Sequence, residues 1–161
     1  MIIEACDPGC AEAQELVAAL SSALAAITGD SGAASFSLAD ARVARSLFVV
    51  AKSESGTLLG CGALRPLDGA GGGDLGEIKR MYAKPGTRGV GAALLAHLER
   101  EAQGFGYREL WLETRRVNLR AVGFYRAHGY IEIANYGRYV GRAEAICFGK
   151  RLERNRDFRA T

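Results

Sequence analysis

The sequence lacks the features of several large protein classes. No apolar run reaches the roughly 18 residues that a membrane span requires, and the N-terminus has no basic region followed by an apolar run. The four cysteines form no CxxC pair and lie in no histidine-rich neighbourhood, which argues against a disulfide framework and a zinc site. We therefore expect a cytoplasmic protein without a metal, in which Cys61 and Cys147 belong to the core because they lie inside apolar runs.

An excess of charge is also missing. The formal net charge is +3, which is too small to indicate a nucleic-acid partner, and the basic C-terminal stretch has only Phe158 as an aromatic residue. Lysine occurs only at positions 52, 79, 84 and 150, so arginine supplies most of the positive charge. A guanidinium suits phosphate and carboxylate ligands, but the same bias is typical of a GC-rich genome. We expect no nucleic-acid partner and no membrane partner.

Length and composition predict a single domain. The chain has 161 residues, of which 48% are hydrophobic and 24% are charged, and this is enough to form one substantial core. We expect the domain to cover residues 1–152 and a charged tail to cover residues 153–161.

The spacing of apolar residues predicts a fold that mixes strands and helices. In chain order we expect a strand at Met1–Ala5, helices at Cys10–Ile27 and Leu38–Arg45, strands at Leu47–Ala51, Thr57–Leu64 and Leu75–Ala83, a helix that buries Leu94, Leu95 and Leu98, a strand at Tyr107–Thr114, a helix at Asn118–His128, and strands at Gly129–Ala134 and Ala143–Leu152. Too many of these strands are linked by hairpins for a fully parallel sheet. The pattern therefore favours a mixed sheet with helices on both faces.

The most informative segment is Glu77–Leu95, in which a strand enters a glycine-bearing turn that opens into an amphipathic helix. Arg88, Gly89 and Gly91 lie at this join. The first turn of a helix has backbone N–H groups without partners and the positive end of the helix dipole. Glycines let an anion approach those groups and an arginine adds charge-assisted hydrogen bonds, so the join predicts a phosphate cradle. The alternative is an ordinary turn that needs small residues for packing.

Two motifs within Glu77–Tyr130 resemble the GNAT superfamily of acyl-CoA-dependent N-acyltransferases. Arg88-Gly-Val-Gly-Ala-Ala93 is similar to the family's Q/R-x-x-G-x-G/A pyrophosphate signature, and Asn118–Tyr130 is similar to its N-x-x-A-x-x-F/L-Y-x-x-x-G-F/Y segment. The resemblance extends over residues 1–152. It implies an α/β (α+β) fold with a mixed, mostly antiparallel sheet of about seven strands, splayed between strands 4 and 5, and about four helices on both faces.

The resemblance also implies which residues bind the co-substrate, acetyl-CoA. The fourth strand would pair with the pantetheine arm, and a backbone amide of Met81 or Tyr82 would polarise the thioester carbonyl. The segment after Pro85 is shorter than usual in the family, so the register of individual amides on the phosphates stays open. The implied cofactor-binding residues are Met81, Tyr82, Ala83, Arg88, Gly89, Val90, Gly91, Ala92 and Asn118.

Three residues are the candidates for catalysis. Asn118 and Tyr125 are seven positions apart and therefore lie on one helix face, about 10 Å apart along the axis. The resemblance implies that the Tyr125 hydroxyl reaches the sulfur of the leaving thiolate, whereas otherwise Tyr125 would be a half-buried core residue and Asn118 a helix cap. Acyl transfer to an ammonium ion also needs a base. Glu77 or Glu113 could serve, directly or through water, unless each is solvated or paired with arginine.

The expected function is transfer of an acetyl group from acetyl-CoA to a primary amine of a small molecule, by direct attack in a ternary complex. A non-catalytic acyl-CoA sensor and an acetyltransferase for protein N-termini or lysines are the alternatives. Arg115, Arg116 and Arg120 could hold a carboxylate of the acceptor, hold the 3′-phosphate of the coenzyme, or face solvent. The sequence decides neither the acceptor nor between a monomer and a homodimer.

Overall fold

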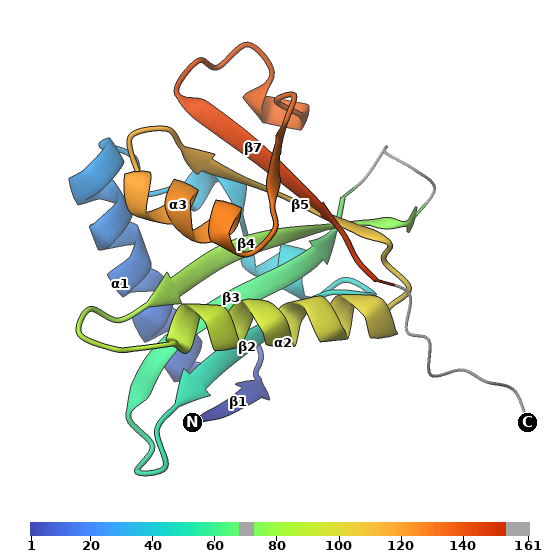
Figure 1. Ribbon diagram of the computed structural model, residues 1–161. Coiled ribbons are helices and arrows are strands. Elements are labelled where there is room, and N and C mark those ends of the chain that lie inside the picture. Colours follow the sequence, from blue (N-terminus) through green and yellow to red (C-terminus); the bar gives the residue numbers. More distant parts are fainter. Residues whose placement is uncertain (68–72, 154–161) are drawn as a thin grey trace, which may run out of the picture.

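The computed structural model describes residues 1–67 and 73–153 (Figure 1). The charged tail expected at residues 153–161 lies outside this part of the chain, apart from Glu153. The helices are α1 (Ala11–Thr28), α2 (Val90–Gly104) and α3 (Leu119–Ala127), and the strands are β1 (Ile2–Ala5), β2 (Leu47–Lys52), β3 (Leu58–Pro66), β4 (Leu75–Ala83), β5 (Glu109–Arg115), β6 (Ile131–Ile133) and β7 (Ala145–Arg151).

The seven strands form one sheet in the order β1-β2-β3-β4-β5-β7-β6. Only β4 and β5 run parallel, and every other neighbouring pair is antiparallel. This confirms the mixed, mostly antiparallel sheet. The α-helix expected at Leu38–Arg45 is wrong, because a 3₁₀ turn at Leu38–Ala41 replaces it and leaves three α-helices in the described ranges. The Ser37–Asp40 capping box closes this single turn, and the left-handed Arg45 (φ 61°) cannot continue a helix.

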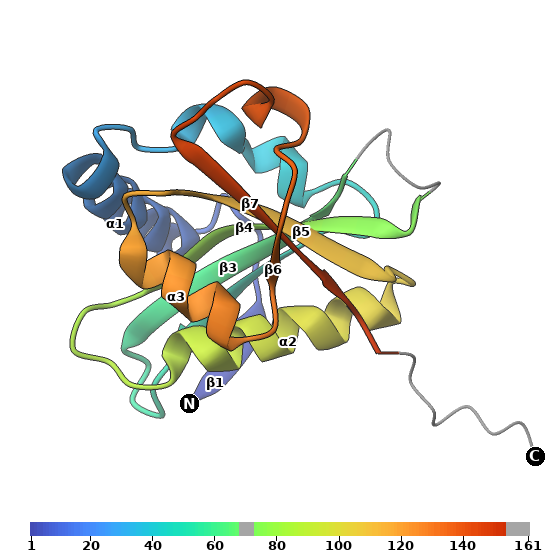
Figure 2. The same ribbon diagram turned by 45° about the horizontal axis from the view of Figure 1, so that its top comes forward.

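Helices cover both faces of the sheet. Figures 1 and 2 show α1 on one face and α2 with α3 on the other. Strand β2 alternates accordingly: Phe48 and Val50 pack in the cluster beneath α1, whereas Val49 and Ala51 pack in the cluster beneath α2. The apolar face predicted for the second long helix is confirmed by Leu94, Leu95 and Leu98 of α2, which are fully buried.

The sheet splays between β4 and β5. These strands pair only from Leu75 and Glu109 to Glu77 and Trp111, after which β4 continues along β3 and β5 continues along β7. The register of β4 against β3 shifts opposite Gly62, and Arg80 takes a left-handed φ of 53° at this point. Such a bulge bends a strand away from its neighbour. The gap that results positions the functional site.

The close approach of β3 to β4 gives a prediction on stability. A Cβ at Gly60 would lie 2.3 Å from the carbonyl oxygen of Tyr82, so β4 would have to move. Gly60→Ala is expected to lower the free energy of unfolding by about 1–3 kcal/mol. At Gly104, the last residue of α2, an added Cβ meets nothing within 4 Å, and Gly104→Ala is expected to keep or raise stability. Thermal and denaturant unfolding compare the two variants, and equal midpoints would contradict the packing argument.

Candidate active site

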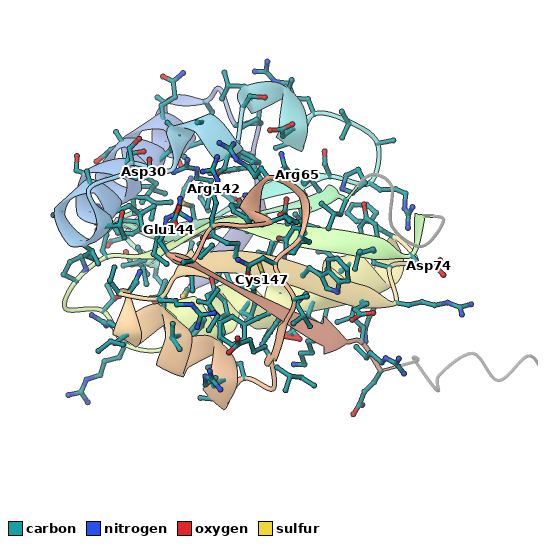
Figure 3. All side chains as sticks on the ribbon, turned by 90° about the horizontal axis from the view of Figure 1, so that it is seen from above. Asp30, Arg65, Asp74, Arg142, Glu144 and Cys147 are labelled. Carbon is teal, nitrogen blue, oxygen red and sulfur yellow. The ribbon has the colours of Figure 1, made fainter. Side chains whose placement is uncertain are left out.

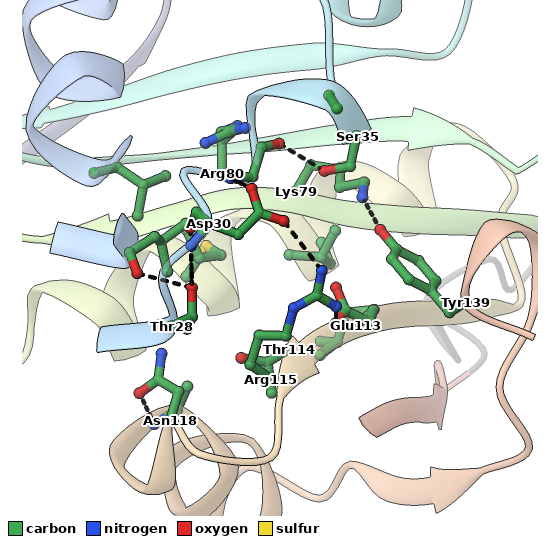
Figure 4. Close-up of a pocket in the computed structure, with 18 of the residues that line it drawn as sticks. Thr28, Asp30, Ser35, Lys79, Arg80, Glu113, Thr114, Arg115, Asn118 and Tyr139 are labelled. Atoms are coloured by element: carbon green, nitrogen blue, oxygen red, sulfur yellow. Dashed lines mark hydrogen bonds and ion pairs between the residues drawn. The ribbon is translucent and has the colours of Figure 1, made fainter. Parts of the chain in front are cut away.

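A cavity of about 150 Å³ opens where β4 and β5 separate (Figure 4). Its walls come from β4, β5, α3, the end of α1, residues 30–35 and residues 138–139. The cavity brings together four of the residues predicted from sequence, which are Met81, Glu113, Asn118 and Tyr125. Segments that are far apart in the chain therefore meet at this splay.

The Tyr125 side chain is held rigidly in the cavity wall. It is 8% exposed, and its ring packs edge-on against Phe124 and Tyr130, with ring centroids 5.2 and 5.7 Å away. No group in the described ranges hydrogen-bonds its hydroxyl. Burial raises the pKa of Tyr125, so the hydroxyl stays protonated at neutral pH. A fixed O–H that lacks a partner and faces a cavity can donate a proton to a bound group.

Asn118 caps the helix that carries Tyr125. Its Oδ1 accepts a hydrogen bond from the backbone N–H of Ala121 at 3.3 Å, which confirms the capping interpretation. Figure 4 shows the amide nitrogen of Asn118 on the side away from this bond. Because the residue also lines the cavity, capping leaves two N–H donors for a ligand.

Glu113 supplies a carboxylate to the cavity. Its side chain is 11% exposed and accepts a hydrogen bond of 2.6 Å from Nη1 of Arg115. Burial raises the pKa of Glu113, although the charges of Arg115 and Lys79 oppose this effect. A cavity carboxylate with a raised pKa is a better proton acceptor near neutral pH than an ordinary glutamate.

Glu77 lies elsewhere, in a buried network behind the cavity. It is 1% exposed, Nε and Nη2 of Arg65 each lie 2.8 Å from its Oε1, and the Tyr136 hydroxyl donates to its Oε2. Nζ of Lys79 lies 3.9 Å from the same carboxylate. Glu77 does not line the cavity, and both of its oxygens have partners. The contacts of Glu77 are therefore those of a residue that stabilises the surrounding strands.

Two residues that sequence reasoning missed connect this network to the cavity. Nζ of Lys79 donates a hydrogen bond to the Tyr139 hydroxyl at 2.7 Å, and both side chains line the cavity (Figure 4). Burial lowers the pKa of Lys79 and raises the pKa of Tyr139 to about 12. Neither residue belongs to a sequence motif, and Tyr139 comes from a 3₁₀ turn that only the tertiary fold brings to β4.

The predicted cradle is an open helix N-terminus. The first helical hydrogen bond of α2 runs from the Ala93 N–H to the Gly89 carbonyl at 3.0 Å, and no side chain caps Gly89. The N–H groups of Val90, Gly91 and Ala92 therefore lack partners within the described residues. Arg88, just before them, is exposed and makes no ion pair with any described residue. These groups present only positive charge and donors to an anion.

The cradle adjoins the cavity. A Cβ at Gly91 would lie 3.4 Å from the ring of Phe124, so the first turn of α2 sits on α3 next to Tyr125. The end of β4 leads from the cavity, at Met81, towards the turn before α2, and its residues Tyr82 and Ala83 pair with β3 on one side only. On its other side β4 has no strand partner beyond Glu77 among the described residues. An extended ligand can therefore hydrogen-bond along this edge.

Only one of the three arginines expected near the acceptor, Arg115, lines the cavity. Its Nη2 lies 3.4 Å from Asp30, whereas Arg116 pairs with Glu132 at 3.5 Å outside the cavity and Arg120 is exposed.

Residues 1–67 and 73–153 contain no group of three or more His, Cys, Asp or Glu side chains that could hold a metal ion. No helix in these ranges is both long and apolar enough to span a membrane.

Comparison with known proteins places residues 16–130 in the acetyltransferase (GNAT) family model. An IAA acetyltransferase of Azospirillum brasilense is 39% identical over 94 residues, which cover 57% of this chain and 59% of that relative, so the match spans just over half of its length. A GNAT-family acetyltransferase structure from Staphylococcus aureus superposes with a TM-score of 0.72 at 16% identity, covering 94% of this chain and 100% of that one. N-acetylglutamate synthase from Neisseria gonorrhoeae, complexed with coenzyme A and N-acetyl-glutamate, superposes with a TM-score of 0.68 at 19% identity, covering 96% of this chain and 36% of that one. At these sequence identities, the two superpositions show that the folds are alike and nothing more.

Proposed function

Because this chain belongs to the acetyltransferase (GNAT) family, we propose that it transfers an acetyl group from acetyl-CoA to a primary amine of a small molecule. One observation carries the proposal: the uncapped N-terminus of α2 adjoins a cavity whose wall holds a carboxylate with a raised pKa and a protonated tyrosine that has no hydrogen-bond partner among the described residues. We take residues 1–152 as the single catalytic domain.

Acetyl-CoA would lie along the splay. The N–H groups of Gly89, Val90, Gly91 and Ala92, with Arg88, would hold the pyrophosphate. The pantetheine arm would pair with the open edge of β4 at Met81, Tyr82 and Ala83, and its amides would also meet the free amide nitrogen of Asn118. The Neisseria relative, which has the same fold, is complexed with coenzyme A, and this supports the assignment.

The cavity residues can then perform direct transfer. Glu113 accepts a proton from the acceptor's ammonium group, and the amine nitrogen attacks the thioester carbon. A backbone amide of Met81 or Tyr82 stabilises the negative charge that develops on the carbonyl oxygen. The C–N bond forms, the C–S bond breaks, and the Tyr125 hydroxyl protonates the departing sulfur. The second proton that the nitrogen loses returns to Tyr125, and Glu113 releases the first proton to solvent. We assign the base role to Glu113 rather than Glu77, because only Glu113 lines the cavity.

Binding of coenzyme A tests the cradle. At a hundred times its dissociation constant, coenzyme A is expected to stabilise the protein by about 2.7 kcal/mol without added metal. Gly91→Asp should lose most of this gain, because a carboxylate would stand against the pyrophosphate. Gly91→Ala is the matched control, since its methyl group would only touch the Phe124 ring at 3.4 Å and adds no charge. Thermal unfolding with and without coenzyme A measures both variants, and an equal gain in a folded Gly91→Asp protein would refute the cradle.

A further inference from the structure

Arg80 occupies an unusual place on β4. It lies at the bulge opposite Gly62, with a left-handed φ of 53° that large side chains rarely adopt. Its side chain lines the active-site cavity and also a second cavity, of about 360 Å³, between α1 and residues 33–38. Figure 4 shows it across the cavity from Glu113 and Arg115. The guanidinium is therefore shared by the walls of both cavities.

This guanidinium is buried without an ion pair to any described residue. Arg80 is 8% exposed, and the hydrogen bond of its side chain runs from Nη1 to the Ser31 carbonyl at 3.2 Å. Within residues 1–67 and 73–153, no carboxylate lies within 4.0 Å of it. Burial lowers the pKa of Arg80, which expresses the same shortage of favourable contacts for its charge.

Two other arginines, Arg65 and Arg115, differ from Arg80 because they form ion pairs. Arg65 and Arg115, which are each about four-fifths buried, both make ion pairs with two carboxylates at 2.6–3.4 Å. Asp30, the carboxylate of the cavity wall whose charge acts on Arg80, is already paired with Arg115. A buried cation that has lost water and gained no anion is unfavourable. Arg138 also lines the cavity without an ion pair to any described residue, but its side chain is exposed to solvent, so Arg80 is the buried arginine whose charge a ligand anion would neutralise.

The position of Arg80 fits an anion on the same molecule as the reacting amine. Arg80 precedes Met81, whose backbone we place at the thioester. A small acceptor whose amine attacks the thioester can therefore reach Arg80 with its anionic end. A cavity of about 150 Å³ is below the roughly 300–1,000 Å³ of drug-sized sites, which favours a small acceptor. A carboxylate matches the guanidinium in a bidentate geometry, and because it is smaller than a phosphate it suits a cavity of this volume better.

We propose that the acceptor is a small amine that carries a carboxylate, and that Arg80 binds this carboxylate. This inference rests on the proposed acetyl transfer and names its substrate class. The reaction remains balanced as before: the amine nitrogen gains the acetyl group, coenzyme A leaves as the thiol, and one ammonium proton passes to the solvent.

The proposal is tested by incubating the protein with acetyl-CoA and matched amines and by measuring the thiol that is released. Glycine, β-alanine and 4-aminobutyrate are each compared with the corresponding carboxamide, and 2-aminoethyl phosphate is included as the phosphate counterpart. The best carboxylate is expected to exceed its amide at least about 10-fold in kcat/KM, as a charge-assisted hydrogen bond allows. A stronger preference for the phosphate, or equal use of acids and amides, would overturn the inference while leaving acetyl transfer intact.

Two variants then test whether Arg80 causes the preference for a carboxylate over an amide. Arg80→Asn removes the charge but tolerates the left-handed backbone, and it should abolish the preference mainly through a higher KM. Arg108→Gln is the control, because Arg108 is exposed and lies 3.8 Å from Asp74, which Figure 3 shows at the end of the sheet remote from Asp30. A preference that survives in Arg80→Asn would contradict the assignment.

A binding measurement separates this inference from the proposed function. N-acetyl-β-alanine, added with coenzyme A, should raise the melting temperature of the natural protein and of Arg108→Gln but not of Arg80→Asn. If no amine reacts and this difference is still seen, the carboxylate site stands and acetyl transfer fails. Equal shifts in all three proteins, or none in any of them, would overturn the assignment of Arg80.

Discussion

Tyr125→Phe is expected to lower kcat by about 10²–10⁴-fold, the range that a positioned general acid contributes. Phenylalanine keeps the ring that packs against Phe124 and Tyr130, so only the proton donor is lost. Coenzyme A affinity should change little, because an interaction made mainly in the transition state lowers kcat without raising KM. Steady-state thiol release and calorimetric titration of coenzyme A measure the two quantities separately.

The leaving group provides a control for this variant. Acetyl thioesters whose thiols have a lower pKa need less help from an acid, so they should restore part of the lost rate in Tyr125→Phe. A near-normal kcat with acetyl-CoA would refute the general-acid role. Tyr125 would then be a wall of the tunnel that holds pantetheine.

Glu113→Gln is expected to lower kcat/KM by about 10²–10⁴-fold, since glutamine cannot accept the ammonium proton. In the proposed mechanism, only the ionised form of Glu113 can accept the ammonium proton. Because burial raises the pKa of this residue, activity should be lost as the pH falls, starting at a higher pH than for an ordinary glutamate. This acidic limb should be absent from the pH profile of the variant. Arg115, Lys79 and Glu77 are the groups whose charges act on this titration.

Glu77→Gln is the comparison that decides between the two carboxylates. It disrupts a buried network with Arg65 and Tyr136, and removing one partner of a buried ion pair costs about 3–5 kcal/mol. Stability should therefore fall while the folded fraction keeps kcat/KM within roughly a factor of ten. If Glu77→Gln loses activity as Glu113→Gln is expected to do, and Glu113→Gln does not, the base assignment is reversed.

Local pattern was sufficient to predict most of the fold. The period of Leu94, Leu95 and Leu98 marked the buried face of α2, and the glycines at positions 89 and 91 marked its uncapped start. These features depend on neighbours within a few residues. The error at Leu38–Arg45 arose because an apolar spacing compatible with a helix was overridden by the capping box and by the left-handed Arg45.

The part of the cavity that we propose for the acceptor could not be predicted in the same way. Arg80 and Tyr139 act through burial, and burial depends on which distant segments pack over β4. The bulge opposite Gly62 has no local signal either, because Arg80 is a residue type that ordinarily avoids the backbone conformation it adopts there. Glu77 and Glu113 likewise look equivalent in sequence, and both pair with an arginine. Only the three-dimensional structure shows that Glu113 lines the cavity and Glu77 does not.

Product analysis tests the central claim most directly. The protein is incubated with acetyl-CoA and the amine panel, and free thiol and N-acetylated amine are quantified together by mass spectrometry. Acetyl transfer predicts that thiol release requires an amine, that the two products form in equal amounts over many turnovers, and that Tyr125→Phe suppresses both. A protein that binds acetyl-CoA through Arg88 and Gly91 but leaves it intact with every amine would contradict the account, and it would be a sensor of acyl-CoA instead of an enzyme.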